Sequence, residues 1–344
     1  MQIRKAAAIG GGVIGAGWVA RLVLNGIDVS VFDPAPDAGR KIDEVMAGAR
    51  RAYAQMAPAG LPAEGRITHA ATIAEAVAGA ELVQESVPER LDIKHKVLAE
   101  IDAHAPHQAL IGSSTSGLRP TDMQPALQHP GRLVVAHPFN PVYLLPLVEI
   151  VGGEATTPDT ITRAKQVYAS IGMKPVVIRK EIEAFVGDRL LEALWREALW
   201  LVKDGITTVE ELDDIIRYSF GLRWAQMGLF QVYRIAGGEA GMRHFMAQFG
   251  PCLAWPWTKL TDVPEFNDEL VELIASQSDA QSSRWSIREL ERIRDDNLVA
   301  IMGALSKQNG GEGWGAGALM KGYVARLEAA AQAEKELSKK ALAQ

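Results

Sequence analysis

The sequence predicts an α/β fold in which a doubly wound parallel sheet is followed by an all-α C-terminal domain. Two observations lead to this prediction. Apolar strand-like runs alternate with helix-like segments up to about residue 180, and helical periodicity then dominates from Phe185 onward. A length of 344 residues with 48% hydrophobic composition suffices for two cores. We expect a sheet domain over residues 1–183, a helical domain over 184–327, and a helical or frayed tail over 328–344.

The glycine-rich stretch near the N-terminus is the strongest local signal. From Ala6 to Asp33 it has the pattern of strand, glycine turn, helix and second strand. Gly10, Gly12 and Gly15 have the spacing G-x-G-x-x-G, which permits a tight turn, close approach of a pyrophosphate, and packing of helix on strand. The predicted dinucleotide-binding turn of this Rossmann-type domain comprises Gly10, Gly11, Gly12, Val13, Ile14 and Gly15.

Asp33 lies 18 residues after Gly15, at the end of the second predicted strand. A carboxylate there accepts hydrogen bonds from ribose hydroxyls and repels a 2′-phosphate, so we expect NAD rather than NADP. The alternative is a glycine-rich turn without a ligand, because 32 glycines in 344 residues produce such spacings by chance. The helix-ending pair Asn25-Gly26 and the strand-like Val29–Phe32 favour the dinucleotide site.

Further strands follow in an order that places polar residues at one edge of the sheet. Those after Val29–Phe32 are expected at Ile67–Thr68, Ala80–Ser86, Ala109–Ser113, Arg132–Ala136, Leu147–Val151 and Lys174–Ile178, with helices at Pro34–Met56, Ile73–Val77, Ile93–His104 and Thr160–Ile171. A polar turn, Ser114-Thr115-Ser116-Gly117, follows one strand, and His137 follows the next. Ligands of open α/β sheets bind at the carboxyl ends of strands, which is where these residues fall.

His137, Glu149 and Ser116 form the candidate catalytic set. Hydride transfer from a secondary alcohol needs a base near the hydroxyl, and histidine suits that task. An antiparallel return through 141–146 brings Glu149 to the imidazole, where a carboxylate fixes the tautomer and stabilises the imidazolium. Ser116 is placed to bind the substrate oxygen. From spacing alone, the alternative stays open that these are a loop histidine, a strand-end charge and a turn former.

Composition excludes several classes of partner. A net charge of −6 argues against nucleic-acid binding and gives no reason to expect a membrane surface. The single cysteine, Cys252, excludes an internal disulfide framework and a Cys-rich metal site, so no metal is expected. Without a signal-peptide pattern or an apolar run approaching roughly 18 residues, we expect a soluble cytoplasmic protein.

Several motifs together resemble the 3-hydroxyacyl-CoA dehydrogenase family over nearly the whole chain. They are IGGGVIGAG, the S-x-S-G turn, HPFNP, LVEI, and FVGDRLL at the domain boundary. The resemblance implies that His137 is the catalytic base, Glu149 its partner and Ser116 the hydroxyl ligand. It also implies that Glu89, Lys94 and Ser114 bind the cofactor, Ser114 standing where an asparagine is usual. For Glu89 and Lys94 the alternative is a solvated charge pair that begins a helix.

Two departures from the family pattern argue against an acyl-CoA substrate. Asp188 replaces an asparagine that lines the family's active site, so that a hydrogen-bond donor becomes an acceptor. Between Lys41 and Lys94 there is no lysine, although members that bind acyl-CoA commonly place lysines in this region.

The helical half contains the stretches FVGDRLLEALWREALWLVKDGI, FGLRWAQMG and GGEAGMRHFMAQFGP, and there it resembles family members that oxidise the 3-hydroxyl of L-carnitine. Asp188, Glu192 and Trp195 share one helical face, where carboxylates and an aromatic ring suit a trimethylammonium group. Arg196 and Arg223 are candidates for the substrate carboxylate. The alternative is that Arg189 and Arg196 neutralise the acids and that the tryptophans belong to a core or a dimer interface.

Other functions stay open at this point. A relative of L-gulonate 3-dehydrogenase shares the late helix Arg294–Met302, and a 3-hydroxybutyryl-CoA dehydrogenase is the general family alternative. A non-catalytic NAD-binding regulator is the third. The resemblance, together with the apolar helical half, also predicts a homodimer assembled through that half.

Overall fold

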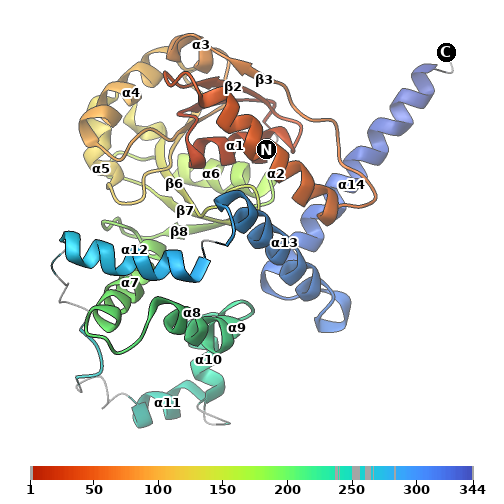
Figure 1. Ribbon diagram of the computed structural model, residues 1–344. Coiled ribbons are helices and arrows are strands. Elements are labelled where there is room, and N and C mark those ends of the chain that lie inside the picture. Colours follow the sequence, from red (N-terminus) through yellow and green to blue (C-terminus); the bar gives the residue numbers. More distant parts are fainter. Residues whose placement is uncertain are drawn as a thin grey trace. The chain divides into compact units, whose positions relative to one another are not determined.

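The chain divides into two compact units in the computed structural model, which describes residues 3–236, 239, 241–249, 256–259, 265, 267–282 and 284–342 (Figure 1). The first unit combines Met1–Val186 with Arg294–Gln344, and the second is Gly187–Ile293. Cys252 lies outside the described residues.

One eight-stranded sheet organises the first unit, in the order β3-β2-β1-β4-β5-β6-β7-β8. The β6–β7 pair is antiparallel, and the other neighbouring strands are parallel. The predicted doubly wound sheet is therefore confirmed. Its strands are β1 (Lys5–Ile9), β2 (Asp28–Phe32), β3 (Ile67–His69), β4 (Leu82–Glu85), β5 (Leu110–Ser113), β6 (Leu133–Pro138), β7 (Leu147–Val151) and β8 (Lys174–Ile178).

Both faces of the sheet are covered by helices, which explains the nearly continuous apolar strands. On β1, Ala6 and Ala8 face one core while Ala7 and Ile9 face the other. The first core lies under α1 (Val13–Val23), α2 (Ala38–Met56) and α6 (Pro158–Ser170). The second lies under α3 (Ile73–Val77), α4 (Leu91–His104) and α5 (Pro120–Met123), as Figure 1 shows.

The strand order reverses at β1, which lies between β2 and β4. The chain leaves β1 for β2 on one side and later returns to β4 on the other, and ligands of open α/β sheets bind at the carboxyl ends of the strands beside such a reversal. The glycine turn follows β1, and the turn that carries Ser116 follows β5 at the same edge. The fold therefore places the predicted cofactor and catalytic residues at one edge of the sheet.

The C-terminal segment folds back onto the first unit. From Arg294 the rest of α13 (Ile287–Ser306) and α14 (Gly315–Leu342) pack over the core beneath α1 and α2. Tyr53 of α2 and Tyr323 of α14 meet there through their hydroxyls at 2.9 Å. The division thus differs from the expected helical domain over 184–327, because periodicity predicts a helix but not the surface on which it packs. Residues 328–342 belong to α14.

The second unit is helical throughout its described residues, as expected for the all-α part. Its helices are α7 (Gly187–Lys203), α8 (Val209–Tyr218), α9 (Phe220–Trp224), α10 (Leu229–Ala236), α11 (Gly241–Phe249) and α12 (Asp268–Ser282). A capping box begins α8, where the Thr208 side chain accepts from Glu211 N and the Glu211 carboxylate accepts from Thr208 N. Among the helices described in either unit, none is long and apolar enough to cross a membrane.

Candidate active site

The turn between β1 and α1 has the geometry that a bound dinucleotide needs. Gly10 has φ +101°, and a Cβ there would lie 2.6 Å from Ser86 O. A Cβ on Gly15 would lie 1.9 Å from Gly10 O, so the approach of α1 to the turn requires glycine at position 15, while the backbone after β4 requires it at position 10. At Gly12, by contrast, a Cβ would meet no described protein atom within 4 Å. The space beside Gly12 fits a pyrophosphate at the N-terminus of α1.

Asp33 lies against this turn from the end of β2. Its Oδ2 accepts a hydrogen bond from Gly11 N at 2.5 Å, and its Oδ1 accepts one from Ala35 N at 2.7 Å. The two bonds fix the carboxylate beside the glycine turn. Contact with the adenosine ribose remains the prediction for this carboxylate.

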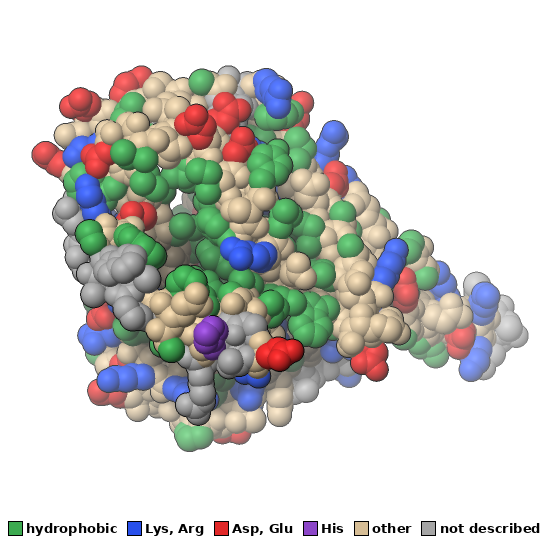
Figure 2. Space-filling model, turned by 90° about the horizontal axis from the view of Figure 1, so that it is seen from below, with side chains coloured by type: hydrophobic (Ala, Val, Ile, Leu, Met, Phe, Trp, Pro, Cys, Tyr) green, Lys and Arg blue, Asp and Glu red, His purple; other side chains and the backbone are tan. Residues whose placement is uncertain are grey.

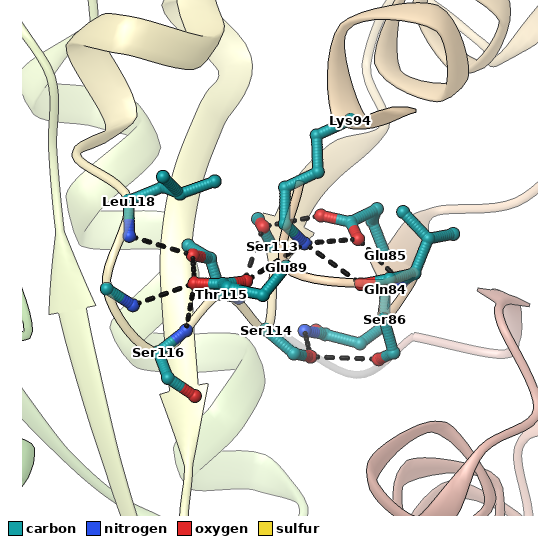
Figure 3. Close-up of polar contacts among 12 residues, drawn as sticks. Gln84, Glu85, Ser86, Glu89, Lys94, Ser113, Ser114, Thr115, Ser116 and Leu118 are labelled. Carbon is teal, nitrogen blue, oxygen red and sulfur yellow. Dashed lines mark hydrogen bonds and ion pairs between the residues drawn. The ribbon is translucent and has the colours of Figure 1, made fainter. Parts of the chain in front are cut away.

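Glu89 holds the turn that carries Ser116 (Figure 3). Its Oε1 accepts from Ser116 N at 3.1 Å, from Gly117 N at 2.9 Å, and from the Thr115 hydroxyl. Burial raises the pKa of Glu89, but the bonds from Thr115 and Gly117 and the nearby Lys94 charge outweigh that effect and leave the pKa below its usual value. The Ser116 hydroxyl points away from these contacts in Figure 3. Glu89 therefore orders the turn while leaving that hydroxyl exposed.

Lys94 is buried rather than solvated, with only 1% of its surface exposed. Its Nζ lies 2.8 Å from Glu85 Oε1 and 3.6 Å from Glu89 Oε2. Ser113 in turn donates to Glu85 Oε2 at 2.5 Å. The alternative of a solvated Glu89–Lys94 pair is therefore wrong for Lys94, whose charge is compensated by the fully buried Glu85.

Ser114 is the centre of a separate hydrogen-bond group. Its hydroxyl contacts Trp18 Nε1 at 3.0 Å, Gln84 Nε2 at 2.7 Å and Ser86 Oγ at 2.9 Å. These bonds tie α1 to the ends of β4 and β5. The hydroxyl thus has several protein partners at the position where we expected cofactor contact.

His137 and Glu149 meet across the antiparallel pair of strands. They are register partners on β6 and β7, and His137 Nδ1 lies 2.9 Å from Glu149 Oε2. Both side chains are buried, with 4% and 3% of their surfaces exposed. Glu149 Oε1 also accepts from Val186 N at 3.1 Å. The carboxylate is positioned to hold the imidazole with its proton on Nδ1, which makes Nε2 the basic nitrogen.

Aromatic rings and a strained backbone surround this pair. The ring centroids of Phe139 and Phe185 lie 4.9 Å and 5.6 Å from that of His137. Ala184 and Phe185 have φ of +59° and +50°, a left-handed conformation that costs roughly 1–2 kcal/mol for a residue with a Cβ. Ala184 N donates to Gly117 O at 3.2 Å. The strained segment therefore contacts the Ser116 turn as well as the His137–Glu149 pair.

The predicted substrate residues lie in the second unit on two helices. Asp188 is in the first turn of α7, and Trp195, on the same helix, is 53% exposed. Glu192 forms an ion pair of 3.4 Å with Arg196, the neutralisation weighed as the alternative to binding a cation. Arg223 belongs to α9 and borders a cavity of about 250 Å³ with Met227 and Val232.

Sequence reasoning missed Glu85, Ser113 and Thr115, which support the predicted residues. Glu85 carried a detectable signal, because a carboxylate inside the apolar strand 82–85 must find a buried partner. Ser113 and Thr115 carried none, since a serine and threonine run is equally typical of a turn.

Comparisons with known proteins identify the family of this chain. Residues 5–182 match the 3-hydroxyacyl-CoA dehydrogenase NAD binding domain, and residues 185–263 match the C-terminal domain of the same family. An L-carnitine dehydrogenase of Mesorhizobium japonicum is 79% identical over 94% of this chain and 90% of its own length. The L-carnitine dehydrogenase/betainyl-CoA thioesterase of Rhizobium meliloti is 65% identical to this chain. That match covers 94% of this chain and 66% of the longer protein.

A solved structure is similar over most of the chain. The crystal structure of an NAD-dependent 5-formyl-3-hydroxy-2-methylpyridine-4-carboxylic acid 5-dehydrogenase has 29% sequence identity and a TM-score of 0.73. The match covers 90% of this chain and 100% of that protein. With both domains of one family matched in order over residues 5–182 and 185–263, the chain belongs to the 3-hydroxyacyl-CoA dehydrogenase family.

Proposed function

We propose that this protein is an NAD-dependent dehydrogenase that oxidises the 3-hydroxyl of L-carnitine to 3-dehydrocarnitine. The observation that carries the chemistry is the buried contact of 2.9 Å between His137 and Glu149 at the edge of the sheet where the glycine turn lies. The names of the relatives at 79% and 65% identity support carnitine as the substrate.

In the proposed reaction His137 is the general base. Glu149 accepts a hydrogen bond from Nδ1–H and stays ionised, so Nε2 is the nitrogen that takes the proton of the substrate hydroxyl as the hydride leaves the carbon. The imidazolium that forms is stabilised by the ionised Glu149 in this buried setting. Ser116, whose hydroxyl is exposed on a turn fixed by Glu89, binds the substrate oxygen and orients the carbon.

The residues that would hold NAD come from the same edge of the sheet. The Gly10–Gly15 turn would bind the pyrophosphate and Asp33 the adenosine ribose, and Glu89, Lys94 and Ser114 are the residues that we propose for the nicotinamide side. NAD supplies the hydride acceptor when it is bound. The chain's own task is to orient the reacting carbon and to receive the proton at His137.

The helical unit is proposed to recognise carnitine's permanent cation and its carboxylate. The trimethylammonium has no N–H to donate, so it is best met by an aromatic face and a carboxylate, here Trp195 with Asp188 or Glu192. Glu192 forms an ion pair of 3.4 Å with Arg196, and Asp188 lies one turn earlier on the same helix, so both acids stay candidates for the charge partner. Arg196 and Arg223 remain the candidates for the substrate carboxylate.

A panel of four substrates followed by NADH absorbance tests the proposal. It contains L-carnitine, D-carnitine, L-gulonate and 3-hydroxybutyryl-CoA, each with NAD. Preference for L-carnitine is the expected result. A preference for L-gulonate or for the CoA ester would replace the proposed substrate, whereas no NADH from any of them would favour a non-catalytic NAD-binding protein.

We further propose a cytoplasmic homodimer assembled through the helical unit. Large apolar side chains of this unit are strongly exposed in the single chain, including Tyr218 at 75% and Phe230 at 71%. Figure 2 shows hydrophobic side chains across the face seen from below. Such surfaces are commonly covered by a partner. The molecular mass from solution scattering at micromolar concentration tests the assembly, and a monomeric mass would exclude it.

A further inference from the structure

The segment that joins His137 to Glu149 is held tightly in the first unit. Residues 139–146 connect β6 to β7, and Val142, Tyr143 and Leu144 within it are buried. Any displacement of this connection moves the ends of both strands, and with them the imidazole and the carboxylate. Groups that fix the connection therefore bear on the alignment of the reacting pair.

One set of contacts comes from the cofactor-binding helix α1. Arg21, only 1% exposed, donates from Nε to Val142 O at 2.7 Å and from Nη2 to Leu145 O at 3.2 Å. Its Nη1 donates to Ile171 O at 3.0 Å, just before β8. A Cβ on Gly17 would lie 2.9 Å from Val142 Cβ, so the helix and the segment are in close contact. The buried guanidinium fixes one side of the segment.

A second contact comes from the C-terminal segment. The Tyr143 hydroxyl donates to Asp295 Oδ2 at 2.5 Å, and Asp295, on α13, is 2% exposed. Arg294 donates to the other oxygen, Asp295 Oδ1, at 2.8 Å and 3.0 Å. A tyrosine hydroxyl is protonated at physiological pH, and burial together with the bond to Asp295 raises the pKa of Tyr143 further above its usual value.

We propose that Asp295, acting through the Tyr143 hydroxyl, is a positioning residue for the His137–Glu149 pair. The inference rests on the proposed roles of those two residues. Residues 294–344, which pack within the first unit, then also serve catalysis. Asp295 of α13 holds residues 139–146, the connection between His137 and Glu149, from a second side. A shift of reacting groups by about 1 Å can lower the rate roughly 10²-fold. Loss of the single buried bond between Tyr143 and Asp295 is therefore expected to lower kcat.

The test compares two tyrosine-to-phenylalanine substitutions that remove the same atom. Tyr143→Phe deletes the hydroxyl bonded to Asp295. Tyr53→Phe deletes a buried hydroxyl that bonds Tyr323 of α14, and so also loosens a C-terminal helix, but it lies outside residues 139–146. Both variants are compared for kcat, KM for NAD and melting temperature, with L-carnitine as substrate.

We expect Tyr143→Phe to lower kcat about tenfold, with the KM for NAD and the melting temperature changed no more than in Tyr53→Phe. Asp295→Ala should lower kcat by a similar factor. The double variant with Tyr143→Phe should have nearly the same kcat as Asp295→Ala alone, because both changes remove the same hydrogen bond. Asp295→Asn, which keeps the size of the side chain, is the second variant if Asp295→Ala does not fold.

Two outcomes would overturn the inference. One is a kcat for Tyr143→Phe within twofold of that for Tyr53→Phe, and the other is a loss confined to melting temperature. His137→Ala separates this failure from failure of the proposed function. If His137→Ala is inactive while Tyr143→Phe is fully active, only the positioning role of Asp295 is contradicted. If His137→Ala is active, the role of His137 as general base is contradicted, and with it the proposed function.

Discussion

His137 Nδ1 lies 2.9 Å from Glu149 Oε2, where the antiparallel return of β7 sets the two residues opposite each other. We expect His137→Ala to lower kcat by about 10²–10⁴-fold, the usual contribution of a general base. NADH affinity, measured by fluorescence titration, should be largely kept because the base acts on the substrate. Glu149→Gln provides a graded control, since it keeps the shape but not the charge that stabilises the imidazolium. A near-normal rate for His137→Ala would place the base elsewhere.

Asp33 gives a prediction about cofactor choice. Asp33→Ala should reduce the ratio of kcat/KM for NAD to that for NADP, because it removes both a ribose acceptor and a charge that repels a 2′-phosphate. The same change deletes the bond of 2.5 Å from Gly11 N, so Asp33→Asn, which retains an acceptor, is the matched control. Unchanged selectivity in both variants would contradict the assignment.

The sequence predicted the sheet because each strand carries its own local signal. Strands buried on both faces, such as β4, β5 and β6, are short apolar runs, and all eight expected runs overlap β1 to β8, including the largely exposed β3. The glycine spacing and the polar ends of the strands then located the candidate site, since the carboxyl ends of parallel strands share one edge. His137 and Glu149 were paired for the same reason, because a short return between strands sets opposite residues in register.

What the sequence left undetermined depends on contacts between distant segments. Lys94 looks like an exposed helical lysine until β4 brings Glu85 to it, and Arg21 looks like a surface residue until residues 141–146 and 171 cover it. The position of residues 294–344 depends on the apolar surface left on α1 and α2. Helical periodicity predicts that one face of a helix is buried, but it does not predict the surface against which that face packs.

The pH dependence of stability should report the contacts of Glu89. Its pKa lies below the ordinary value of 4.5, so its contribution is fully present above pH 4.5 and is lost as the pH falls through the lowered pKa. Glu89→Gln should therefore lower the free energy of unfolding at pH 7, and this difference should shrink as the pH falls below about 4.5. Urea titrations from pH 7 to pH 3 measure it. Glu312→Gln, an exposed acid of the same unit, is the control for net charge. A difference independent of pH would contradict the prediction.

The recognition of a permanent cation is tested with an isostere of the substrate. Replacing the trimethylammonium of L-carnitine by a tert-butyl group keeps the shape and removes only the charge. Binding should weaken by about 1–2 kcal/mol, the range for a desolvated cation over an aromatic face, which is roughly 5- to 30-fold in the dissociation constant. Turnover should fall with it. Equal efficiency with the neutral isostere would refute recognition of the charge.

Two substitutions on α7 identify the acid that meets the cation. Asp188→Asn restores the residue usual in the family and should raise the KM for L-carnitine more than that for NAD. Glu192→Gln makes the same removal of charge one turn further along the helix, and the variant with the larger rise in the KM for L-carnitine identifies the acid. The same two variants should bind the tert-butyl isostere as well as the parent does, since no charge is present to be lost. If Asp188→Asn weakened both compounds equally, Asp188 would act through packing or helix structure, and the partner of the trimethylammonium would have to be sought among the other side chains of the helical unit.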